Sequence, residues 1–141
     1  MTTLREIFIE ALMTRLRQDD ELQARGVHFR RSIFSAVDSE EPFVIAVHRG
    51  GDPLVDENIG RVTRECIVMV TAVVRDPAPD QAADRLFERT HPLVMGFDAA
   101  GVLGVREIGT GEPEVADFDG GVGVVTMRYS IQYQTRPDSL S

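Results

Sequence analysis

The sequence predicts a single α+β domain in which two helices pack on one face of a mostly antiparallel β-sheet. A chain of 141 residues has room for one such domain, spanning 1–141, with a core that needs no disulfide or metal. Two segments show the period of an amphipathic helix, one near the N-terminus and one after residue 75. β-rich segments separate and follow them. The expected element order is α-β-β-β-α-β-β.

The first helix is predicted from a capping signal and an apolar stripe. Thr3 suits the N-cap position, and Glu6 would complete a capping box. Asp19 and Asp20 are expected to end the helix. The stripe consists of Leu4, Ile7, Phe8, Ala11, Leu12 and Leu16.

Three strands are expected before the second helix. Residues 27–33 alternate weakly, whereas 42–48 are apolar on both faces, as in the middle of a sheet. Residues 49–60 contain three glycines, a proline and three acids, which indicates a loop. Residues 61–75 form one long strand that starts beyond the sheet in a solvated half, becomes buried at 67–74, and pairs as a hairpin with the strand before it.

The second helix should begin at Pro79 or Asp80, break or kink at Pro92, and end near Gly96. Its inner face carries Ala82, Ala83, Leu86, Phe87, Leu93 and Val94.

Two further strands close the chain, at 102–108 and 122–135, around an acidic, glycine-rich segment with a tight turn at 119–121. The last strand alternates clearly, with Tyr129 and Tyr133 on its inner face and their hydroxyls satisfied in the core. The other buried strand positions are expected to be Phe43, Ile45, Ile67, Met69, Val125, Met127 and Ile131.

Charge excludes one class of function. The chain has 23 acidic and 15 basic residues, a net charge of −8, and every basic residue is arginine. Residues 32–141 carry nine arginines against eighteen acids, so no basic stripe is available to bind DNA or RNA phosphates. The absence of lysine fits either codon usage or ion-paired protein interfaces, which arginine suits better.

Motifs for catalysis, metals or cofactors are lacking, so we expect no enzyme and no cofactor. His28, His48 and His91 have no metal-ligand spacing. Cys66, the single cysteine, is expected to be a buried, unactivated thiol. The glycine-rich segment 119–123 precedes a strand and therefore predicts a turn rather than a phosphate loop. We expect no secretory signal in the first residues, and no apolar run is long enough to span a membrane.

The order of elements resembles the tail terminator proteins of long-tailed bacteriophages, the lambda-type family. The most telling piece is the ending VVTMRYSIQYQTRPDS, with its closing strand at 129–133 before a short polar tail. The stretch at 91–95 and the helix after 75–77 are also similar. The resemblance covers most of the chain as an order of elements.

This resemblance implies a structural role in a virion. A ring of subunits, a homohexamer in the family, caps the head-proximal end of the tail tube after assembly in the host cytoplasm. Its expected partners are other copies of itself, the tail tube protein and a head-completion or stopper protein. DNA would pass through an acidic lumen without sequence-specific binding.

Two sets of residues are candidates for these contacts. The loop at 49–60 is expected to contact the tube or line the lumen, or else to be a solvated hairpin tip, and its candidates are Arg49, Asp52, Asp56 and Glu57. The candidates for the subunit interface, which include a C-terminal arm at 135–141, are Arg61, Thr63, Glu65, Arg128, Gln132 and Arg136. The alternative functions are a head–tail connector or completion protein, and a small α+β domain that binds a ligand or acts as an enzyme.

Overall fold

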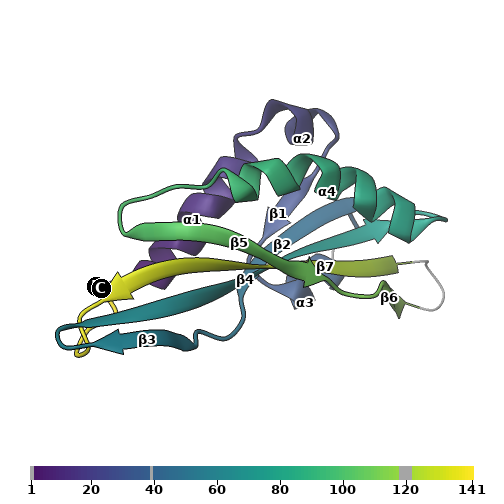
Figure 1. Ribbon diagram of the computed structural model, residues 1–141. Helices are drawn as coiled ribbons and strands as arrows, with labels where there is room; N and C mark the ends of the chain where they lie inside the picture. The colour runs from purple at the N-terminus through teal and green to yellow at the C-terminus, as the bar shows by residue number, and fades with distance from the viewer. Residues whose placement is uncertain (1, 39, 118–121) are drawn as a thin grey trace.

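The computed structural model describes residues 2–38, 40–117 and 122–141, and its fold is the predicted α+β class. The elements in chain order are α1 (Leu4–Arg17), α2 (Asp20–Ala24), β1 (His28–Arg30), α3 (Ile33–Asp38), β2 (Phe43–Arg49), β3 (Leu54–Asn58), β4 (Arg61–Arg75), α4 (Pro79–Met95), β5 (Val102–Thr110), β6 (Glu114–Asp117) and β7 (Val122–Thr135). The strands form one sheet in the order β1-β2-β4-β7-β5, with β3 added to β4 and β6 to β7 (Figure 1). All strand pairs are antiparallel except β1–β2.

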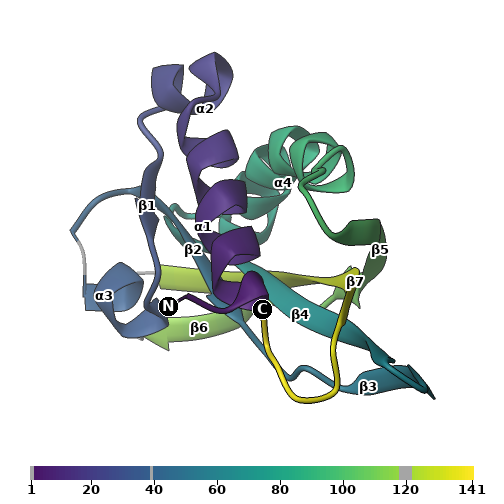
Figure 2. The ribbon, with the colours of Figure 1, turned by 90° about the vertical axis from the view of Figure 1, so that its left-hand side faces the viewer.

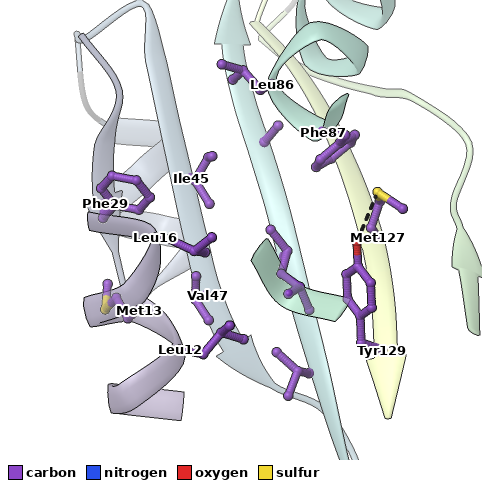
Figure 3. Packing of buried hydrophobic residues seen from close by; sticks show 14 of the residues in the cluster. Leu12, Met13, Leu16, Phe29, Ile45, Val47, Leu86, Phe87, Met127 and Tyr129 are labelled. Atoms are coloured by element: carbon purple, nitrogen blue, oxygen red, sulfur yellow. Dashed lines mark hydrogen bonds between the residues drawn. The ribbon is translucent and has the colours of Figure 1, made fainter. Parts of the chain in front are cut away.

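The helices cover the two faces of the sheet unequally. Helices α1, α2 and α4 lie on one face, and the short α3 lies on the opposite face (Figure 1). Leu12 and Leu16 of α1 and Leu86 of α4 reach the same layer of β2, β4 and β7 side chains and bury it almost completely (Figure 3). A smaller cluster around Ala36 packs α3 against the second face. Most of the apolar stabilisation therefore comes from the first face.

Strands β4 and β7 are the two long neighbouring strands inside the sheet, and their register decides which side chains are buried. They pair from Val62↔Thr135 to Arg75↔Val122, and both strands have the predicted bounds. Cys66, Val68 and Val70 share the helix-covered face with the buried side chains of β7. The expectation that Ile67 and Met69 lie in this core is therefore wrong: the two-residue period of a strand puts them on the opposite face, where they are half-buried.

The start of α1 differs from the predicted capping box in one respect. The Thr3 hydroxyl accepts a hydrogen bond from the Glu6 backbone N–H at 3.4 Å, as an N-cap should. The Glu6 carboxylate instead pairs with Arg31, 3.0 Å away. Helix α1 ends at Arg17 with Gln18 as its C-cap, directly before the predicted end at Asp19. Asp19 in addition caps α2, since its side chain accepts from the Leu22 N–H at 3.1 Å.

Helix α4 continues through Pro92 to Met95, so of the predicted break or kink at this proline the break is wrong. Gly96 is the C-cap as expected, with an ordinary φ of −86°. The first turn of α4 packs tightly on β7, because a Cβ added to Gly123 would lie 2.2 Å from a ring carbon of Pro79. Glycine is required at that position to let the helix approach the strand.

The structure also contains elements that the periodicity did not reveal. The predicted strand at 27–33 shortens to β1 because Ile33 already begins α3. The predicted loop at 49–60 contains β3, and the acidic segment after β5 contains β6. The turn expected at 119–121 lies outside the described residues. None of the described helices has the length and apolarity needed to cross a bilayer.

Candidate functional site

A β-hairpin formed by β3 and the first residues of β4 projects from one end of the sheet (Figure 1). All five residues of β3 are exposed, and β4 is the strand that pairs with them. Ile59 and Gly60 form the turn, where the φ of Gly60 is +88°, a conformation that favours glycine. The turn carries a fully exposed Ile59, with Leu54 and Val55 more than 45% exposed nearby. The hairpin therefore exposes both apolar and charged side chains at its surface.

The two sides of the hairpin carry different charges. Asp56 is opposite Thr63 and Asn58 is opposite Arg61, so Asp56 and Arg61 share one side. Glu57 is opposite Val62 and therefore lies on the other side. Asp56, Glu57 and Arg61 have no ion-pair partner among the described residues, although the Asp56 carboxylate accepts from the Glu57 N–H at 2.9 Å.

Asp52, the first of the three acids in the predicted contact loop, makes its contacts within its own chain. Its side chain is 6% exposed and pairs with Arg5 of α1 at 2.6 Å. The Tyr133 hydroxyl of β7 donates to the same carboxylate at 3.0 Å. Burial, together with this carboxylate, raises the pKa of Tyr133 well above its usual range. Asp52 thus ties the base of the hairpin to α1 and β7, which leaves Asp56 and Glu57 as the outward-facing acids of the loop.

The predicted interface residues at the start of β4 are also linked to their own sheet. The Glu65 carboxylate pairs with Arg106 of β5 at 3.1 Å and accepts from the Gln132 amide of β7 at 3.5 Å. The Gln134 amide donates to the Thr63 hydroxyl at 3.2 Å. Cross-strand contacts of this kind hold the projecting strand rigid.

A groove of about 540 Å³ lies on the face of the sheet opposite α1 and α4. Its apolar lining comes from Ile33, Val37, Met69 and Val124. Its charged lining comes from Arg128, Glu112 and Glu114, which are all exposed. These charges have no ion-pair partner among the described residues. Arg128 is the one groove residue among the predicted subunit-interface residues, and the groove itself was not predicted, because it exists only where α3 and the β5–β6 connection meet the sheet.

The remaining candidates lie apart from the hairpin turn and the groove. Arg49 is exposed at the end of β2. Arg136 is exposed after β7 and lies 3.6 Å from Asp138. The segment after β7 turns back to the N-terminus, where the Leu140 carbonyl accepts from the Leu4 N–H at 3.0 Å (Figure 2). The C-terminal residues of a free chain thus cap its own α1.

The side chains that most often carry chemistry are occupied in other ways. Burial raises the pKa of the Cys66 thiol to about 12, so it remains protonated at neutral pH. Nδ1 of His91 lies 2.9 Å from the Tyr129 hydroxyl, and Nε2 of His48 lies 3.2 Å from the Thr71 hydroxyl. Within the described ranges, no three His, Cys, Asp or Glu side chains form a group that could hold a metal ion. The two tyrosines of β7 have satisfied hydroxyls, as predicted.

The chain thus has an α+β fold with an exposed hairpin at one end of the sheet and a groove on the face opposite α1 and α4. No family model and no curated protein matches the sequence. Among solved structures, the fold is similar to a chain in the virion of a native gene transfer agent particle, with a TM-score of 0.59 and 13% sequence identity. The match covers 94% of this chain and 96% of that chain, so the two folds correspond over nearly their whole length.

Proposed function

We propose that this protein is a structural subunit of a phage-type virion that closes into a ring at the head-proximal end of the tail tube. In that position it would stop the growth of the tube and provide the surface that joins the head. The observation that carries the proposal is the likeness to a virion component along almost the entire length of both chains. The order of elements, which resembles the tail terminators, supports the same role.

The surfaces of the chain are consistent with assembly into a ring. A closed ring needs two different patches on each subunit, since every contact joins the front of one copy to the back of the next. The hairpin and the groove are two such patches on separate parts of the sheet. The net charge of −8 suits a lumen that repels DNA phosphates and lets DNA pass. No step of this role requires catalysis.

Light scattering and negative-stain electron microscopy of the purified protein test the ring. We expect a closed ring of about six subunits at micromolar concentration. Adding the protein to tail tubes during polymerisation should then fix their length, whereas bovine serum albumin at the same concentration should not. A ring that binds isolated heads but not tubes would favour the head–tail connector. A monomer that binds a small molecule would favour a ligand-binding domain or enzyme.

Two variants probe the sequence-based candidates within this role. Deleting residues 136–141 should weaken the ring, and an unchanged oligomer mass would contradict the predicted arm. Replacing Asp56 and Glu57 by their amides should disturb tail joining or DNA passage. Asp52 is kept in this second variant, because its carboxylate holds the hairpin base in the free chain.

A further inference from the structure

The hairpin tip and the groove have matching chemistry. The side of the hairpin that carries Asp56 and Arg61 presents one negative and one positive charge next to the exposed Ile59. The groove presents the opposite charges, a positive one on Arg128 and negative ones on Glu112 and Glu114, around an apolar lining. Charge complementarity of both signs selects one partner and one orientation more strongly than a single pair of charges does.

The tip cannot reach the groove of its own chain. Arg61 stands at the start of β4, and Met69, which lines the groove, stands eight residues further along the same strand. At about 3.3 Å per residue in an extended strand, the two positions are about 26 Å apart. The rigid pairing of β4 with β7 keeps that separation. Any contact between the tip and a groove must therefore join two copies.

We propose that the hairpin tip of one copy occupies the groove of the next copy, as the contact that links subunits in the ring. Asp56 pairs with Arg128 of the neighbour, Arg61 pairs with Glu112 or Glu114, and Ile59 covers the apolar lining. The proposal rests on the proposed ring and names its subunit contact. Glu57, on the other side of the hairpin, stays free for the tube or the lumen.

A charge-swap experiment tests this contact, with oligomer mass measured by light scattering in low salt, where exposed charges are least screened. Asp56→Arg and Arg128→Glu should each raise the dissociation constant of the subunit contact at least about tenfold, because each places like charges together. Mixing the two variants should restore assembly. In an alternating ring, the arginine-bearing tip meets the glutamate-bearing groove, and the native tip meets the native groove. The matched control is Glu57→Arg, which makes the same change on the other side of the hairpin and should assemble normally.

Disulfide trapping provides a measurement that does not depend on ring stability. Copies carrying Ile59→Cys are mixed with copies carrying Met69→Cys and oxidised. In the control, copies carrying Leu103→Cys, at an exposed position on β5, take the place of the Met69→Cys copies. The native Cys66 is buried and does not interfere. We expect a mixed dimer joined through positions 59 and 69, identified by mass spectrometry of the linked peptides. Trapping equal to that of the control would overturn the proposal.

The outcomes separate this contact from the proposed function. If the wild-type protein forms rings and both single charge variants form them equally well, the hairpin contact is overturned and the proposed ring stands. Charge-swap rescue in open filaments that do not stop tube growth would support the contact and refute the terminator role. Crosslinking of position 59 to tail tube protein alone would assign the tip to the tube and overturn the proposal.

Discussion

Replacing Asp52 by alanine should destabilise the folded monomer, because this carboxylate joins three parts of the chain. It accepts hydrogen bonds from Arg5 at 2.6 Å and from the Tyr133 hydroxyl at 3.0 Å. The guanidinium is partly exposed, so solvent screening limits the loss of that ion pair to about 0.5–1 kcal/mol. The tyrosine is fully buried, and its stranded hydroxyl would cost about 1–3 kcal/mol.

The total destabilisation expected for Asp52→Ala is about 3 kcal/mol, or a fall of about 9 °C in Tm for a domain of this size. Tyr133→Phe alone should cost about 1 kcal/mol, since the carboxylate keeps its arginine. Adding Tyr133→Phe to Asp52→Ala removes the stranded hydroxyl, so the double variant should be more stable than Asp52→Ala. The two changes should thus be strongly non-additive.

Urea unfolding followed by circular dichroism measures these three free energies. Additive losses would refute the proposed hydrogen bond between the two side chains. A stable Asp52→Ala variant that loses only binding to the tail tube would show that this acid is a contact residue, as the sequence alone had suggested, and not an anchor.

Three further predictions concern other parts of the core. Hydrogen bonds from Arg89 hold the pKa of Asp19 below its ordinary value of 3.8, so its contribution to stability is present above that pH and is lost as pH falls through the folded pKa. Asp19→Asn should therefore have a lower free energy of unfolding than wild type at neutral pH. Urea titrations should find a smaller difference between the two proteins at about pH 2. The Cys66 thiol should resist a chromogenic disulfide reagent at about pH 8 in the native protein and react fully in urea; rapid native labelling would contradict its burial. Gly123→Ala should lower the free energy of unfolding by about 1–3 kcal/mol through overpacking against α4. Gly104→Ala, with no atom within 4 Å of its new Cβ, is the control and should leave the unfolding midpoint nearly unchanged.

Only part of the candidate site could be predicted from the sequence. The exposed Arg61 and Arg128 follow from strand alternation, which needs no tertiary information, whereas Val62 in the half of β4 predicted to be solvated is buried. The anchoring role of Asp52 did not follow, because its partners lie 47 and 81 residues away along the chain. The groove was not predicted either, since α3 and β6 are too short to leave a clear period in the sequence.

The sequence by itself determined the α+β class, the bounds of the two longest strands and the burial of the β7 tyrosines, and its net charge predicts that the chain has no basic nucleic-acid surface. These features depend on local periodicity and on net charge, which the order of residues contains directly. Tertiary structure alone decided which face of β4 is buried, as Ile67 and Met69 illustrate. Both faces of that strand are apolar in sequence, so the pairing register and the covering helices select between them. The same long-range pairing places a charged hairpin and a charged groove at separate positions on one chain.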